Sequence, residues 1–398
     1  MALRHISDAD RRNRIGVRHA LAPAHRLTTV EDVTRAMTAL HATEAATVHL
    51  AVAARAEGLK AEDVDAELYD SRRVVKQLAM RRTLFVFPRD LLPAAWGSAS
   101  ARVATAERKR IAKAIAAGGI ADDGEAWLDA AREAVLAELA SGPATTAELR
   151  ARVPELAGMV GGDSGKSYDR PVPVAPWVLT HLGLDGRALR GRNGGHWRRN
   201  LPTWTTAEHW LGTVEPALDE AEGYAALVRR WLATFGPGTA ADIQWWLGST
   251  KTAVTRALAT VEAEEVSLDD GTTGWVLPDD LDDVAPVDPW AALLPALDPT
   301  VMGWKARDFY LDPAHVPHLF DTNGNAGTTA WWDGRVVGCW VQDDAGVVRL
   351  SLLEDVGPRG RAALEHEAER LTAWLDGTVI GNIYASRQMR QALRDLAS

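Results

Sequence analysis

Cysteine is almost absent from this chain, since Cys339 is the only one among 398 residues. A single cysteine excludes an intramolecular disulfide framework and a cysteine-rich zinc finger. Long apolar runs are absent too, because none approaches the roughly 18 residues of a membrane-spanning helix. The charged N-terminus contains no apolar signal core. We therefore expect a cytoplasmic protein without a membrane partner.

Several familiar enzyme motifs are missing as well. The sequence has no phosphate-cradling glycine-rich loop, no His-Glu-x-x-His and no nucleophile elbow. Asp312, His315 and His318 come nearest to a metal-ligand set. Pro313 and Pro317 would break the helix needed to align these three side chains. The sequence thus predicts neither a metal nor another cofactor.

Positive charge is scarce and unevenly placed in a chain of net charge −10. Residues 1–204 contain 30 Lys and Arg against 24 Asp and Glu, a balance of +6, whereas residues 205–398 contain 14 against 30, a balance of −16. Such asymmetry suggests one binding half and one solvated or partner-facing half. The N-terminal excess is too small to imply DNA binding by itself.

One segment is present twice. Gly142–Leu149 and Gly236–Ile243 share the pattern Gly-Pro-x-Thr-x-Ala-acid-aliphatic. Gly-Pro turns the chain, the threonine can cap the next helix, and the acidic residue three positions on can close a capping box. Helix, turn, helix followed by a strand hairpin is a winged helix, which usually binds DNA. The alternative is a chance echo between two ordinary helix starts.

Apolar periodicity and turn residues along the chain extend this pattern. They predict a mostly α fold with small β elements, arranged as three winged-helix modules and a C-terminal β-containing region. The expected boundaries are 1–120, 121–205 with a basic hairpin, 206–288, and 289–398 with a β-meander and a helix. The expected helices are 28–40, 46–57, 61–69, 125–140, one ending near 157, 174–182, 224–235, 252–264 and 361–374. The expected strands and hairpins are 82–87, 184–204, 266–277, 331–340 and 347–352, with a loop at 158–168.

A basic hairpin tip in the second module is the first candidate binding feature. Arginine neutralises phosphate, and an aromatic ring can wedge or stack at an unstacked base step. A solvated loop with ordinary surface charges is the alternative. The candidate DNA contacts are Arg187, Arg190, Arg192, His196, Trp197, Arg198 and Arg199. A second basic run, at 108–113, is more typical of a solvated helix face than of a phosphate contact.

His41, Thr43 and Glu44 form the candidate catalytic group, in the segment Leu40-His41-Ala42-Thr43-Glu44. On a non-helical joint, side chains two residues apart point to one side of the chain. A neutral imidazole could accept a proton or hold a water, the hydroxyl could align that water, and the carboxylate could add negative charge. Helix capping or surface exposure is the alternative interpretation of these residues.

Five stretches together carry a family resemblance. They are Ala39–Glu44, Met80–Phe85, Leu293–Asp298, Gly324–Gly327 and Trp332–Arg335. On these stretches the chain resembles the winged-helix DNA glycosylases of bacteria. The resemblance implies tandem winged helices that grip duplex DNA, and monofunctional hydrolysis of the glycosidic bond of a ring-nitrogen-alkylated purine, including crosslinked ones.

The chain departs from that family at the catalytic motif. Characterised members have Gln-x-Gln or Gln-x-Asp where this chain has His41-x-Thr43. By position, His41 replaces the first residue and Thr43 the second. A protonated imidazole would oppose an oxocarbenium-like sugar, so the unperturbed histidine pKa predicts loss of activity below about pH 6.

Two other functions remain open from the sequence. A winged-helix protein without chemistry could act as a lesion sensor or regulator on DNA. A protein-interaction scaffold is the second alternative, supported by the acidic C-terminal half. Double-stranded DNA is the expected partner, and a monomer is favoured.

Overall fold

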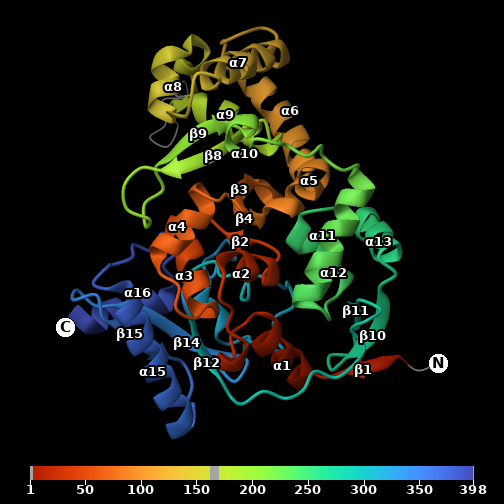
Figure 1. Ribbon diagram of the computed structural model, residues 1–398, viewed down its shortest axis with the longest axis vertical. Helices are drawn as coiled ribbons and strands as arrows, with labels where there is room; N and C mark the ends of the chain where they lie inside the picture. Colours follow the sequence, from red (N-terminus) through yellow and green to blue (C-terminus); the bar gives the residue numbers. More distant parts are fainter. Residues whose placement is uncertain (1–2, 162–169, 398) are drawn as a thin grey trace.

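The computed structural model describes residues 3–161 and 170–397, which form mostly helices with small sheets (Figure 1). This confirms the predicted fold class. Within those residues no helix is both long and apolar enough to cross a membrane. The loop predicted at 158–168 lies mainly outside the described residues, and its start forms strand β6 (Met159–Val160), which pairs with β7 (Val172–Pro173).

The first unit has the element order helix, strand, helix, helix, strand, strand. Its sheet has the strand order β2-β4-β3, so the short first strand lies beside the last one. The elements are α2 (Val30–Ala36), β2 (Leu40–His41), α3 (Ala45–Arg55), α4 (Ala61–Tyr69), β3 (Val74–Leu78) and β4 (Leu84–Pro88).

The second unit repeats this order with the β6–β7 pair inserted between its second and third helices, and it forms the upper lobe of Figure 1. Its sheet, β5-β9-β8, again places the short first strand beside the last one. The elements are α7 (Gly124–Leu139), β5 (Ala144–Thr145), α8 (Thr146–Arg152), α9 (Ala175–Leu184), β8 (Ala188–Asn193) and β9 (Pro202–Thr206).

The third unit has the same order, with a single bridge between Gly238 and Trp275 in the place of the short first strand. Thr145 and Thr239 cap α8 and α12, and both capping boxes predicted from the repeat are formed. The elements of the third unit are α11 (Glu220–Phe235), α12 (Ala240–Leu247), α13 (Lys251–Thr260), β10 (Glu264–Leu268) and β11 (Thr273–Val276).

Strand β1 (Arg4–Ile6) and helix α1 (Asp8–Arg18) pack on the third unit and on the segment that follows it. Strand β1 pairs in parallel with β10. The Arg14 side chain of α1 donates to Asp280 at 2.7 Å and to the Asp282 carbonyl at 2.8 Å. The expected 1–120 module therefore does not account for these residues. The buried Arg14 pairs with an acidic segment far along the chain, and the periodicity of neighbouring residues does not reveal such a contact.

The C-terminal region is an antiparallel meander covered by helices. Its sheet has the order β12-β13-β14-β15, and Asp333-Gly334 forms the predicted turn with positive φ at both residues. Helix α15 (Gly357–Leu375) packs on β12 and β15. The other elements are β12 (Ala291–Leu294), β13 (Thr329–Trp332), β14 (Arg335–Gln342), β15 (Val348–Leu352), α14 (Val316–Leu319) and α16 (Arg387–Ala397).

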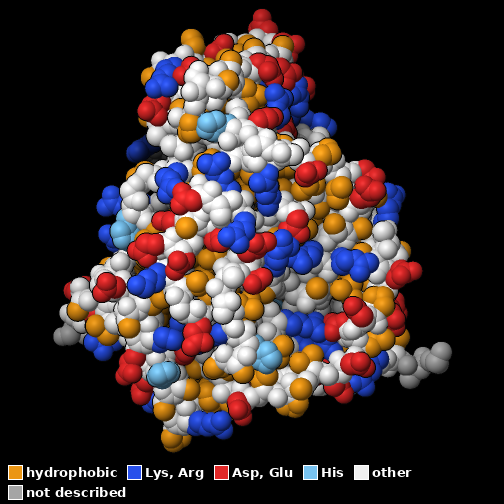
Figure 2. All heavy atoms as spheres, viewed as in Figure 1, with side chains coloured by type: hydrophobic (Ala, Val, Ile, Leu, Met, Phe, Trp, Pro, Cys, Tyr) orange, Lys and Arg blue, Asp and Glu red, His pale blue; other side chains and the backbone are white. Residues whose placement is uncertain are grey.

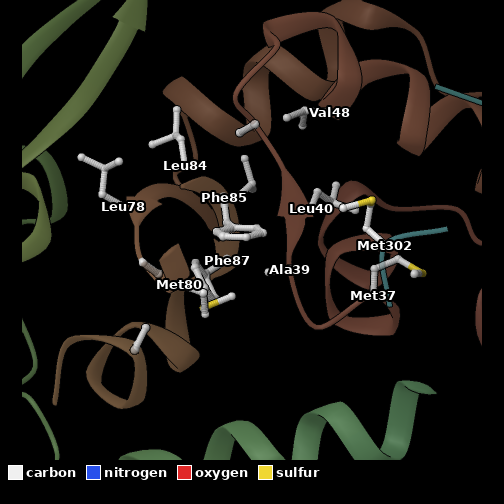
Figure 3. Close-up of a cluster of buried hydrophobic side chains, with 14 of the residues drawn as sticks. Met37, Ala39, Leu40, Val48, Leu78, Met80, Leu84, Phe85, Phe87 and Met302 are labelled. Carbon is white, nitrogen blue, oxygen red and sulfur yellow. The ribbon is translucent and has the colours of Figure 1, made fainter. Parts of the chain in front are cut away.

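Three further helices connect the units. Helix α5 (Leu92–Ala95) packs against α11, and α6 (Ala101–Ala117) runs from the first unit to the second, where it contacts α7 and α9. Helix α10 (Ala207–Leu211) lies against the β8–β9 hairpin. A shared apolar core joins these parts, and Figure 3 shows its portion around Phe85 and Phe87, with Leu40 and Met302 to one side.

Candidate functional site

A short strand positions the candidate catalytic residues. The helix predicted for 28–40 ends at Ala36, because Thr38 adopts a positive φ of 61° and turns the chain into β2. His41 then lies opposite Phe85 on β4, and the next amide, that of Ala42, donates to the Leu84 carbonyl at 2.9 Å. Backbone pairing to β4 therefore fixes where the motif lies.

His41 is a buried, neutral imidazole. Its exposed fraction is 8 %, its ring lies 5.0 Å from that of Phe85, and its Nδ1 has no hydrogen-bond partner among the described residues. Burial, and secondarily the charge of Arg81, lowers the pKa of His41 to about 3. The expected loss of activity below about pH 6 is therefore displaced to much stronger acid. So low a pKa also makes the ring a poor general base near neutrality.

Thr43 lies in the wall of a pocket between the first and second units. The pocket has a volume of about 320 Å³. The Asn200 side chain of the hairpin donates to the Thr43 carbonyl at 3.4 Å, which ties the hairpin to the motif. The lining residues are Thr43, Leu78, Arg82, Leu84, Glu107, Arg110, Pro176, Trp177, Thr180, Arg190 and Asn200.

Glu44 points to a different part of the molecule. Its Oε1 accepts hydrogen bonds from the backbone amides of Ile383 and Tyr384, at 2.5 and 3.3 Å. Burial raises the pKa of this carboxyl, and the two amides oppose that shift. These contacts tie Glu44 to the C-terminal segment, and its catalytic role stays a prediction.

The turn between β3 and β4 carries two arginines in an uncommon backbone conformation. Arg81 and Arg82 have φ of 54° and 61°, which costs about 1–3 kcal/mol for each residue and is typical of functional sites. The guanidinium of Arg81 lies 4.6 Å from the centre of the Trp245 ring. Arg82 lines the pocket beside Thr43. The strained turn thus places the charge of Arg81 near His41 and that of Arg82 in the pocket wall with Thr43.

The arginines of the hairpin have diverse partners. Arg187 is 3.9 Å from Glu133, and Arg192 pairs with Asp70. Arg198 donates to the backbone carbonyl of Val379 in the C-terminal segment. Arg199 is exposed. The hairpin loop is longer than the predicted Asn-Gly-Gly turn, since β8 ends at residue 193 and β9 begins at residue 202.

Trp197, the expected DNA wedge, is half-buried and packs against other rings of the protein. Its ring stacks on His49 at 4.9 Å and meets Trp374 edge-on at 5.7 Å. The exposed His196 ring lies 5.3 Å from the Trp197 ring. These contacts anchor the hairpin loop to the first unit and to α15, so Trp197 serves to hold the hairpin in place.

The sequence did not indicate the pocket residues Arg82, Glu107, Arg110 and Trp177 as a site. Arg110 belongs to the basic run that we interpreted as a solvated helix face. Its neighbour Arg108 fits that interpretation, because it pairs with Asp129 at 2.7 Å. Arg108 and Arg110 differ only in the face of α6 from which they project. Which face borders the pocket depends on the segments that pack against α6, and the sequence does not show these.

Comparison with known proteins agrees with the fold described above. The family profile described as DNA glycosylase AlkZ-like matches residues 34–374. Among solved structures, the chain is similar to Streptomyces sahachiroi DNA glycosylase AlkZ, with a TM-score of 0.73 and 21 % sequence identity. The match covers 94 % of this chain and 98 % of that chain, and at this identity it concerns the fold. No curated protein matches the sequence.

Proposed function

The chain belongs to the AlkZ-like DNA glycosylase family, and from this premise we propose that it hydrolyses the glycosidic bond of alkylated purines in duplex DNA. Bulky and crosslinked alkylpurines belong to the same proposed substrate class. A DNA substrate is consistent with the cytoplasmic location expected from the sequence. The observation that carries the proposal is Thr43, two residues from His41, in the wall of an arginine-lined pocket.

The chemistry of an alkylated purine suits this site. A ring-nitrogen-alkylated base carries positive charge and leaves without a general acid. The remaining requirements are an oriented water and tolerance of an oxocarbenium-like sugar. The Nδ1 atom of the neutral His41 imidazole is buried and has no hydrogen-bond partner among the described residues. It can accept a hydrogen bond from a water that reaches it when DNA is bound. The Thr43 hydroxyl can orient that water, so both residues act in positioning.

DNA contact is proposed through the arginines above the motif. Arg187, Arg190, Arg192, Arg198 and Arg199 belong to a hairpin whose loop is anchored at both sides. An anchored hairpin presents its charges in a fixed position, which reduces the entropy lost on binding. We assign phosphate contact to these arginines and no base contact to Trp197.

Base release from a duplex containing N7-methylguanine tests the proposal. We expect release by the wild type and a loss on the order of a hundredfold in His41→Ala, because water positioning contributes about that much. His41→Gln, which restores the family's amide at this position, is expected to retain release. Mobility shift on the same duplex checks that each variant still binds DNA.

Two results would favour the alternatives. Duplex binding without base release by the wild type would indicate a lesion sensor or regulator. Absence of duplex binding at low salt would indicate a protein-interaction scaffold. Equal release by wild type and His41→Ala would remove His41 from the mechanism.

A further inference from the structure

We propose that the pocket beside Thr43 binds a backbone phosphate of the DNA strand through Arg82, Arg110 and Arg190. This inference rests on the proposed function, because it names which part of the DNA enters the pocket. The three arginines come from the β3–β4 turn, from α6 and from β8, so two units contribute to one anion site.

The charges of the pocket favour an anion. Of the described residues that line it, Arg82, Arg110 and Arg190 are basic and only Glu107 is acidic, which leaves a formal excess of two positive charges. Figure 2 shows Lys and Arg side chains across the middle of one face, with Asp and Glu among them. That face is mixed in charge, whereas the residues that line the pocket carry a positive excess.

Glu107 holds two of the guanidinium groups in place. It lies 3.2 Å from Arg82 and 2.8 Å from Arg110, and it is 9 % exposed. Burial raises the pKa of Glu107, but the two arginines outweigh burial and lower it, so the carboxylate stays ionised. A single carboxylate shared between two arginines orients both without neutralising both.

Arg190 has hydrogen-bonding capacity to spare. Its guanidinium lies 5.2 Å from the centre of the Trp204 ring, donates to Asn200 at 3.3 Å, and has a buried Nε without a partner. Among the described residues it forms no ion pair with a carboxylate. Burial lowers the pKa of Arg190. A partly desolvated guanidinium with an unmet donor gains from the charge-assisted hydrogen bonds that a phosphate accepts.

A phosphate fits the pocket better than a stacked base does. The aromatic residue of the lining, Trp177, already has the guanidinium of Arg110 at 4.8 Å from its ring centre. One face of that ring is therefore occupied. Extrusion of a nucleotide from a duplex needs grip on the flanking backbone, and Thr43 at the pocket wall places this grip next to the motif.

A salt series of duplex binding tests the inference. The logarithm of the duplex association constant is plotted against the logarithm of the salt concentration for wild type, Arg82→Gln, Arg110→Gln and Arg190→Gln. Each variant is expected to lower the magnitude of the slope by about 0.9, the value for one phosphate contact. Arg108→Gln is the matched control on the same helix. Arg108 pairs with Asp129 and Glu125 outside the pocket, so its slope should equal that of the wild type.

Glu107→Gln gives a prediction of opposite sign. Removing the carboxylate frees the guanidinium groups of Arg82 and Arg110, so duplex affinity should rise. This variant keeps the size of the side chain and does not depend on the arginine variants remaining folded. Weaker binding by Glu107→Gln, or a slope for Arg108→Gln as reduced as that of Arg110→Gln, would overturn the phosphate site.

The two proposals fail in different ways. If the wild type releases the base but the pocket variants keep its salt slope, the phosphate site and the phosphate contact assigned to Arg190 are wrong, and the proposed base release stands. If the wild type binds no duplex at low salt, both proposals are wrong.

Discussion

Burial holds His41 and His19 in their neutral form. Burial lowers the pKa of His41 to about 3, and it lowers the pKa of His19 well below the ordinary value, helped by the charge of Arg55. Both shifts oppose the protonation that an unfolded chain undergoes near pH 6.5. The folding stability of the protein therefore depends on pH through both imidazoles.

This linkage predicts acid-sensitive stability. Below about pH 6.5 the unfolded state binds protons that folded His41 does not, so stability falls as the pH falls toward 3. Between about pH 7 and about pH 5, His41 alone should cost about 2 kcal/mol of unfolding free energy. Urea titrations across this range measure the loss, and His41→Gln should lessen it. An unchanged pH dependence in His41→Gln would show that the imidazole titrates normally.

At the same scale, the site residues differ in how visible they are in the sequence. His41 and Thr43 were proposed from their chemistry and spacing, and a family resemblance then pointed to the same positions. A strand of two residues has no periodic signal that would have placed them. The pocket residues Arg82, Glu107 and Arg190 meet only in three dimensions. Even the side-chain directions of Glu44 and Trp197 depended on contacts with residues beyond 370.

At the scale of elements, local signals predicted most helices well. The helix at 61–69 was predicted to the residue, because a capping acid and an apolar stripe mark it. Strand β3 was missed. Its sequence Val-Val-Lys-Gln-Leu is buried throughout and does not alternate, since Lys76 bonds the Tyr69 hydroxyl at 2.6 Å and Gln77 bonds the Gly183 carbonyl at 2.7 Å. Tertiary partners of buried polar groups are not visible in a single chain segment.

The capping boxes of the repeat permit a prediction for two helices. Thr239→Ala removes the hydroxyl that accepts from the Asp242 amide at 3.1 Å. The expected cost is about 1 kcal/mol of unfolding free energy, and Thr145→Ala should cost a similar amount. Chemical denaturation measures both. Thr252→Ala, an exposed threonine inside α13, is the control and should change stability little.

If Thr252→Ala lowers the free energy of unfolding as much as Thr239→Ala does, the threonine hydroxyls stabilise the protein for a reason other than helix capping. The comparison separates a helix-start effect from a general Thr-to-Ala effect.

Across the whole molecule, buried charge holds distant segments together. Arg55 of the first unit and Asp298 of the C-terminal region form a fully buried pair at 2.6 Å, and Thr300 accepts a further bond from Arg55 at 2.8 Å. Leaving one partner of such a pair unmatched is strongly unfavourable. The pair therefore fixes how the C-terminal region lies against the first unit, which carries the motif. Glu44 of the motif also contacts the C-terminal region, at Ile383.

One measurement tests most directly whether DNA meets the motif. Cys339 is buried, and burial raises the pKa of its thiol to about 12, so a Thr43→Cys variant has one accessible thiol. A duplex carrying an activated disulfide tether on one base is used, so that attack by the introduced thiolate forms the protein–DNA disulfide and releases the tether's leaving thiol. We expect Thr43→Cys to crosslink and Thr260→Cys, exposed on α13, not to crosslink. Equal crosslinking of both variants, or crosslinking of Thr260→Cys alone, would contradict the account.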